Sequence, residues 1–198
     1  IFNLITDTNT KLELLPNSFD KNKYELVNTG YKAPAVPGTV AGLLEAHEQF
    51  GKLTLEEILQ PVIKQATDGV PVTYDLRKAI ESTPRLKSDH ESRKIYFKDN
   101  KPLRESSIFI VPGLAKTISL IAKNGRDGFY KGETADKIIT AMNNNGGLFS
   151  EKDLINYKPY IRKPISVNYR GNKVYTAGPP SGGGITLLTA LRILEQFD

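Results

Sequence analysis

The chain has 198 residues, of which 39% are hydrophobic and 25% are charged, a composition typical of globular proteins and unlike that of disordered segments. Its longest apolar runs are well short of the ~18–20 residues that a membrane-spanning helix needs, so we expect no membrane span. The net charge of +5 comes from basic residues interleaved with acidic ones, which favours a mixed solvated surface and no nucleic-acid partner.

Residue types that commonly carry redox or metal chemistry are scarce. The chain has no cysteine, which excludes disulfides, thiolate nucleophiles and cysteine metal ligands. Its two histidines, His47 and His90, stand far apart, and neither has a partner at metal-ligand spacing. We therefore expect no metal site and no cofactor.

The first third of the chain predicts two helices after an irregular start. Residues 1–30 show no strong hydrophobic period and are expected to form loop with one short strand at most. Residues 38–51 (GTVAGLLEAHEQFG) predict a helix that stops at its final glycine. A second helix is predicted from Thr54, because Thr54 and Glu57 have the spacing of a capping box. Pro61 lies inside its pattern and is expected to kink or divide it.

The middle of the chain predicts two further helices around a less regular stretch. Residues 72–83 indicate a short helix. Residues 94–103 (KIYFKDNKPL) predict two strands joined by a turn at the Asp-Asn pair. Residues 112–125 predict a helix with Pro112 in its first turn and Gly125 just past its end.

The last third predicts helices on either side of a hairpin. Residues 132–147 indicate a helix that ends in glycines, and Ser150 with Asp153 resembles a capping box with a weaker acid. A β-hairpin is expected near residues 161–177, because apolar and polar residues alternate around the Arg-Gly-Asn turn. The chain then predicts a helix with an apolar stripe made by Ile185, Leu188, Leu191 and Leu194. Many helices with few strands indicate the α+β class.

The stretch AGPPSGGGITLL at residues 177–188 raises the question of chemistry. Gly178 and Gly183 have the glycine spacing of a phosphate-binding P-loop, but Gly184 and Ile185 stand where that motif needs Lys and Ser or Thr. Ser181 also lacks the glycine two residues earlier that a nucleophile elbow requires. Both a nucleotide site and a catalytic serine are therefore disfavoured.

A structural interpretation of this loop fits better. Two prolines restrict the entry, Ser181 can cap the following helix, and glycines allow the helix start to approach another backbone. On that account Gly183→Val is expected to impair folding or maturation. Since a helix N-terminus carries partial positive charge, Ser181, Gly182 and Gly183 are candidates for the wall of a cleft that takes an anionic substrate.

The acidic residues form no evident acid/base pair. Glu56 and Glu57 stand in the first turn of a predicted helix, where acids complement the helix dipole. Glu45 and Glu48 lie beside His47 on one helix face, which we interpret as solvated.

Four ordered stretches together resemble the gamma-glutamyltranspeptidase family. They are AVPGTVAGLLEAHEQFGKLTLEEILQPVIKQATDGVPV, NGRDGFYKGETADKI, NNNGGLFSEKDLINYKPYIRKPISVNYRGNKVYT and GPPSGGGITLLTALRILEQFD. Their order and spacing match that family over residues 30–198, whereas residues 1–30 match poorly. One departure is Gly182, which stands where the family usually has a second serine.

The resemblance implies that residues 1–198 are a single segment of the large subunit of an N-terminal-nucleophile hydrolase with an αββα core. Members of the family are made as one precursor that cleaves itself. The new N-terminal threonine of the small subunit then transfers a γ-glutamyl group, from glutathione or a related compound, to water or an amine. The implied partners are that small subunit and the γ-glutamyl substrate.

The resemblance also implies that the chemistry lies outside these residues. In family order the threonine nucleophile follows Asp198, and the arginine that binds the substrate α-carboxylate precedes Ile1. No catalytic residue is therefore expected within the segment, which alone should be inactive. A capsule-type poly-γ-glutamate transpeptidase and an amide-bond acylase of the same fold are close alternatives, and a non-catalytic helical scaffold or binding module is the alternative of another class. Bacterial members are usually exported, so an extracellular, periplasmic or cell-wall location is expected.

Overall fold

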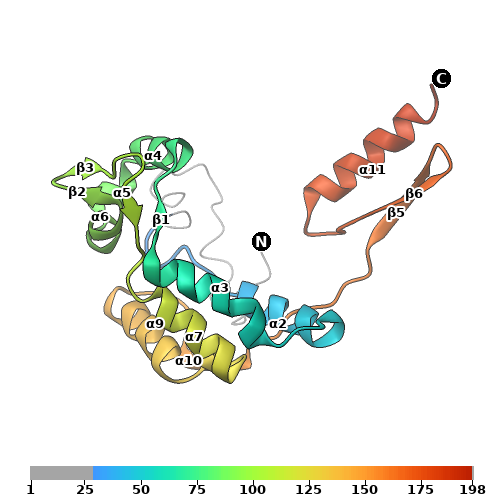
Figure 1. The fold of residues 1–198 in the computed structure, drawn as a ribbon. Coiled ribbons are helices and arrows are strands. Elements are labelled where there is room, and N and C mark those ends of the chain that lie inside the picture. Colours follow the sequence, from blue (N-terminus) through green and yellow to red (C-terminus); the bar gives the residue numbers. More distant parts are fainter. Residues whose placement is uncertain (1–28, 198) are drawn as a thin grey trace. The chain divides into compact units, whose positions relative to one another are not determined.

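A computed structural model describes residues 29–197 of the chain (Figure 1). These residues divide into two compact units, residues 29–157 and residues 158–197. The expected loop or strand within residues 1–28 lies outside the described part.

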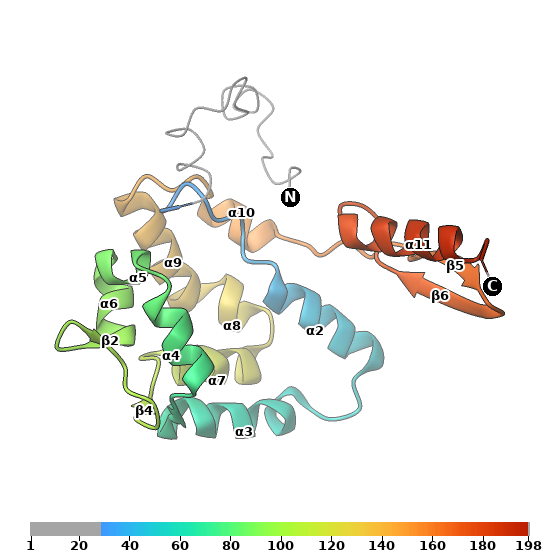
Figure 2. The same cartoon turned by 90° about the horizontal axis from the view of Figure 1, so that it is seen from above.

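The first unit is mainly helical and carries two small antiparallel sheets, β1 with β4 and β2 with β3. Its elements in chain order are α2 (Thr39–Phe50), α3 (Leu55–Asp68), β1 (Val70–Pro71), α4 (Tyr74–Glu81), α5 (Arg85–Ser88), α6 (His90–Tyr96), β2 (Phe97–Lys98), β3 (Lys101–Pro102), β4 (Ile108–Phe109), α7 (Leu114–Asn124), α8 (Asp127–Tyr130), α9 (Gly132–Asn144) and α10 (Glu151–Asn156). Helix α3 lies alongside α7, as Figures 1 and 2 both show, and α8 packs between α7 and α9 along the chain.

Helix α3 begins as its sequence predicts. The Thr54 hydroxyl accepts a hydrogen bond from the Glu57 amide at 3.2 Å, and the Glu57 carboxylate accepts one from the Thr54 amide at 2.7 Å. The Thr54 hydroxyl also donates to the Glu57 carboxylate at 2.7 Å, and this bond, with the one from the Thr54 amide, holds the pKa of Glu57 below its usual value because both favour the charged carboxylate. Pro61 does not divide the helix, which continues unbroken from Leu55 to Asp68.

The stretch after α4 differs in part from its prediction. The turn at Asp99 and Asn100 is present, with φ of 51° and 59°, and it joins two strands of two residues each. Residues 94–96, expected to be strand, instead complete α6, because Asp89 caps that helix by accepting a bond from the Ser92 amide at 2.7 Å.

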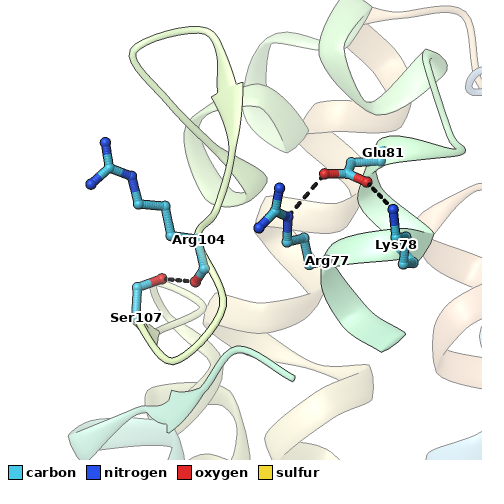
Figure 3. Close-up of polar contacts among 5 residues, drawn as sticks. All are labelled: Arg77, Lys78, Glu81, Arg104 and Ser107. Atoms are coloured by element: carbon cyan, nitrogen blue, oxygen red, sulfur yellow. Dashed lines mark hydrogen bonds and ion pairs between the residues drawn. The ribbon is translucent and has the colours of Figure 1, made fainter. Parts of the chain in front are cut away.

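Polar side chains make short-range hydrogen bonds on α4 and in the turn before β4. Figure 3 shows Glu81 at the end of α4 accepting bonds from Arg77 Nε at 2.9 Å and Lys78 Nζ at 3.1 Å. In the neighbouring turn, the Ser107 hydroxyl donates to the Arg104 carbonyl at 2.5 Å. These pairs are three or four residues apart in sequence, so they stabilise local structure and do not join distant segments.

Helix α7 confirms one of its two predicted boundaries. Gly125 follows the helix with a φ of 56°, and its amide donates to the Ile121 carbonyl. Pro112, however, precedes the helix, because Gly113 takes the N-cap position with a left-handed φ of 82°. A left-handed residue there needs a glycine, so the helix starts after it.

Helices α9 and α10 form as predicted. Met142 on α9 is buried, with Ile138 and Ile139 half-buried beside the core. At the start of α10, the Asp153 carboxylate accepts bonds from the Ser150 amide at 2.7 Å and from its hydroxyl at 2.8 Å. Acidic residues therefore support the positive ends of both α3 and α10.

The second unit consists of a hairpin and one helix. Strands β5 (Ile165–Tyr169) and β6 (Asn172–Thr176) pair antiparallel, and α11 (Gly182–Leu194) packs along them (Figure 2). Arg170 and Gly171 form the two-residue turn with φ of 47° and 80°, the positive pair that hairpin turns of type I′ require. The predicted hairpin is thus confirmed.

The apolar stripe of α11 is buried only in part. Leu188 is buried and Leu191 is half-buried, and Gly184 continues the line at the helix start. Ile185 and Leu194, expected on the same stripe, are exposed within the described chain. Gly184 lies against the end of β6, where a Cβ would be 2.9 Å from the Thr176 hydroxyl.

None of the helices within residues 29–197 has the length and apolarity that crossing a membrane requires. The connecting segment, residues 158–164, forms neither helix nor strand, and Tyr160 in it is 85% exposed.

Candidate functional site

The loop between β6 and α11 is tightly built. Its Pro179–Pro180 peptide bond is cis, and the Ser181 amide donates to the Gly178 carbonyl at 3.0 Å. The chain thus turns within a few residues from the end of β6 into the first turn of α11.

Ser181 occupies the N-cap position of α11, but it does not act as the predicted cap. Its side chain accepts no capping hydrogen bond. Its ψ is 103°, whereas Thr54, whose hydroxyl does cap α3, has a ψ of 156°.

The close backbone approach that glycine permits is found one residue later than predicted. A Cβ on Gly184 would lie 2.0 Å from the Ala177 carbonyl oxygen and 2.9 Å from the Thr176 hydroxyl. A Cβ on Gly183 or on Gly182 would meet nothing within 4 Å in the described chain. The expectation that Gly183 fits against a neighbouring backbone is therefore wrong, and Gly184 has that role.

A hollow of about 430 Å³ lies beside this loop within the second unit. It is lined by residues 162–164 and 176–181, and much of its wall is proline and alanine. Its charged lining residues are Arg162 and Lys163, with no acid among them. The hollow therefore suits a ligand that is at least partly apolar and carries negative charge.

Of the three candidate cleft residues, the hollow includes Ser181 but neither Gly182 nor Gly183. Their contact with a substrate stays a prediction. The hydroxyls that line the hollow, from Thr176 and Ser181, have no histidine within the same unit, since the two histidines lie in residues 29–157.

Both histidines lie in the first unit, and each has a hydrogen-bond partner there. His47 Nε2 lies 2.7 Å from the Leu53 carbonyl, across the connection from α2 to α3. His90 Nδ1 lies 2.9 Å from the carboxylate of Glu91. Within residues 29–197, no group of three or more histidines and acids is placed to hold a metal ion.

A buried tyrosine, Tyr130, forms hydrogen bonds with the backbone of the Pro-Gly-Thr-Val-Ala-Gly stretch at residues 37–42. The Tyr130 hydroxyl accepts a bond from the Ala41 amide at 3.1 Å and donates one to the Pro37 carbonyl at 2.6 Å. Gly38 is the N-cap of α2 and has no side chain to serve those groups. Tyr130, 0% exposed, therefore caps α2 from a different helix. Burial raises the pKa of Tyr130, which keeps its hydroxyl protonated and able to donate.

A second tyrosine requires a glycine at position 38. A Cβ there would lie 2.1 Å from the hydroxyl oxygen of Tyr157, whose ring stacks on Tyr130 with centroids 6.1 Å apart. The Arg126 guanidinium lies 4.4 Å from the Tyr130 ring centroid and donates to the Tyr157 carbonyl. This cluster joins α2, α8 and the end of α10 around the buried Leu154.

The sequence did contain a signal for Tyr130 that we did not use. Gly38 begins a helix at a position where Ser, Thr, Asp or Asn would normally supply the capping oxygen. A helix start without such a side chain needs an acceptor from elsewhere, and a buried tyrosine can provide one.

Comparison with known proteins agrees with this architecture. The model of the gamma-glutamyltranspeptidase family matches residues 9–198. The chain belongs to the gamma-glutamyltranspeptidase family. The match begins within the stretch that we expected to match poorly.

Individual members give the same result. The chain is 40% identical to the glutathione hydrolase proenzyme of Escherichia coli K12 over 172 residues, 86% of this chain and 30% of that protein. It is 36% identical to the acylase ACY 1 proenzyme of Pseudomonas sp. SE83 over 170 residues, 85% of this chain and 30% of that protein. The crystal structure of Helicobacter pylori gamma-glutamyltranspeptidase superposes with a TM-score of 0.85 at 34% identity, covering 90% of this chain and 53% of that one.

These matches confirm the fold class. The chain is α+β and shares the fold of gamma-glutamyltranspeptidases over nine-tenths of its length. It spans about a third of the length of the curated relatives that it matches.

Proposed function

We propose that this chain is part of a gamma-glutamyltransferase, or glutathione hydrolase, that is made as a self-cleaving precursor. The observation that carries the proposal is the family match over residues 9–198, which includes both compact units. Likeness to the glutathione hydrolase proenzyme of Escherichia coli supports both the activity and the precursor.

The proposed reaction passes through an acyl-threonine enzyme. The hydroxyl of an N-terminal threonine attacks the γ-glutamyl carbonyl, and its own α-amino group takes the proton. The leaving amine receives a proton as its bond to the carbonyl carbon breaks, and water or an acceptor amine then releases the γ-glutamyl group. Hydrogen-bond donors around the carbonyl oxygen stabilise the tetrahedral intermediates.

We place that threonine, and the small subunit that it begins, outside the 198 residues. The resemblance described above supports this placement, because in family order the threonine nucleophile follows Asp198. The contribution of the segment is then structural, with the loop at residues 177–181 forming one wall of a cleft.

An acylase that hydrolyses other amides is the second candidate. It is favoured by the 36% identity to the acylase ACY 1 proenzyme, which is close to the identity with the glutathione hydrolases. The gamma-glutamyltransferase and the acylase would both be made by self-cleavage, so the two are distinguished by which amide substrate the protein hydrolyses.

The test uses the full-length protein. We expect two chains on a denaturing gel after expression, and release of chromophore from a γ-glutamyl anilide. N-terminal sequencing of the smaller chain identifies the nucleophile, and its replacement by alanine is expected to abolish both cleavage and turnover.

The outcomes separate the alternatives. Turnover of an acyl amide without a γ-glutamyl group, with none of the γ-glutamyl anilide, would favour the acylase. A protein that stays as one chain and hydrolyses neither amide would leave only the non-catalytic scaffold or binding module.

A further inference from the structure

Two Asn-Gly pairs stand at equivalent places in the first unit, each at the C-terminal end of a helix. Asn124–Gly125 ends α7, and Asn145–Gly146 follows α9. From their different surroundings we propose that Asn145 is a site of spontaneous deamidation in the folded protein, and that the fold protects Asn124.

The reaction needs only the chain and water. The backbone nitrogen of the glycine attacks the side-chain amide carbon of the asparagine, and ammonia leaves as a five-membered succinimide closes. Water then opens the ring at either carbonyl and gives aspartate or isoaspartate. One ammonia is lost and one water is gained, with no redox change. A glycine in the second position favours closure, because it has no Cβ to hinder the approach.

At Asn124–Gly125, the glycine amide that would attack already donates a hydrogen bond. The Gly125 amide donates to the Ile121 carbonyl at 2.8 Å and closes the last turn of α7. Asn124 itself is the final helical residue. Attack on its side chain would require this hydrogen bond to break and the helix end to open first.

At the second pair, the attacking nitrogen is available. Within residues 29–197 no backbone or side-chain acceptor for the Gly146 amide is found. Asn145 and Gly146 are both exposed and lie past the end of α9. The backbone bond that secures this turn is made instead by the next residue, since the Gly147 amide donates to the Met142 carbonyl at 2.7 Å.

One contact restrains the Asn145 side chain. Its Nδ2 donates to the Ala141 carbonyl at 2.8 Å, on the exposed surface. A surface hydrogen bond of this kind exchanges readily with water, so it restrains the amide far less than a helix end restrains Gly125.

Deamidation would change the end of α9 in a defined way. The new carboxylate has no proton to donate to the Ala141 carbonyl, and it places negative charge at the negative end of the helix dipole. Isoaspartate also adds a methylene to the main chain immediately before the turn that holds Met142. We therefore expect fraying of the last turn of α9 in the modified protein.

The experiment incubates the full-length protein at neutral pH and physiological temperature for several weeks. Digestion after lysine gives separate peptides for the two sites, Asn124–Lys131 and Ile138–Lys152. Mass spectrometry with fragmentation measures amide-to-acid conversion at each asparagine. We expect conversion at Asn145 to be at least about fivefold faster than at Asn124.

Two controls make the comparison decisive. In denaturant the two rates should converge, because both pairs then have the same local chemistry. The variant Asn145→Gln should remove conversion from the second peptide, which also contains Asn143 and Asn144, because glutamine closes the corresponding six-membered ring far more slowly and is a bulky neighbour for Asn144. Equal rates in the folded protein, faster conversion at Asn124, or undiminished conversion of the second peptide in Asn145→Gln would each overturn the proposal.

Discussion

Replacing Tyr130 by phenylalanine isolates the capping hydroxyl from the rest of the aromatic cluster. The ring, its stacking and its contacts remain, and only the oxygen between the Ala41 amide and the Pro37 carbonyl is lost. Ala41 is 3% exposed, so water does not readily replace the lost acceptor. Pro37 is half-buried, and water can satisfy its carbonyl in part.

The magnitude follows from these two groups. A buried amide left without a partner costs about 1–3 kcal/mol, and the half-buried carbonyl adds less. We therefore expect Tyr130→Phe to lower the free energy of unfolding by about 2 kcal/mol. The corresponding shift in Tm is about 2–4 °C per kcal/mol for a domain of ~150–250 residues and smaller for the longer full-length protein, so the free energy of unfolding is the quantity to compare.

The assay is thermal and urea unfolding of the full-length protein, with Tyr157→Phe as the matched control. The Tyr157 hydroxyl makes no hydrogen bond within residues 29–197, although its ring belongs to the same cluster. Its removal should change the free energy of unfolding by less than about 0.5 kcal/mol. If the two variants unfold alike, the hydroxyl of Tyr130 does not act as the cap of α2.

Three further predictions concern other parts of the chain. Gly184→Ala should impair folding or maturation, because its Cβ would lie 2.0 Å from a carbonyl oxygen, whereas Gly183→Ala should express and mature normally. Glu133 has its pKa lowered from 4.5 to about 2 by hydrogen bonds from two lysines, so it stabilises the fold above pH 4.5 and that contribution is lost as the pH falls toward 2. Urea unfolding at low salt should therefore show Glu133→Gln less stable than the wild type at neutral pH and equal to it near pH 2. Thr54→Ala should lower stability by about 1 kcal/mol through loss of the cap to Glu57, and Thr54→Ser should restore it.

Local signals in the sequence predicted the regular elements well. The capping box at Thr54, the glycine that follows α7 and the hairpin turn at Arg170 depend on interactions within a few residues, so the sequence is sufficient to place them. Two predicted boundaries were wrong because a residue that we did not expect there occupies a helix N-cap position. Asp89 starts helix α6, which runs over residues expected to be strand, and Gly113 caps α7 after Pro112.

The sequence was less informative about contacts between segments. The loop at residues 177–188 was recognised as a close-packed corner, but Gly184, and not Gly183, meets the Ala177 carbonyl. Adjacent glycines look alike in sequence, and only the direction of the backbone decides which one faces a neighbour. The hydrogen bond from the Ala41 amide to the Tyr130 hydroxyl joins residues 89 positions apart, and no local pattern encodes such a separation.

The aromatic cap changes how the Pro-Gly-Thr-Val-Ala-Gly signature should be used in recognising related sequences. Gly38 is required because Tyr157 fills the space of its side chain, and the helix that it starts depends on Tyr130. The signature therefore depends on two distant residues, Tyr130, which is 89 positions after Ala41, and Tyr157, which packs against Gly38. A divergent sequence that keeps Gly38 but lacks both Tyr130 and Tyr157 no longer has the contacts that explain the motif. A search for related sequences should therefore judge Gly38 together with these two tyrosines.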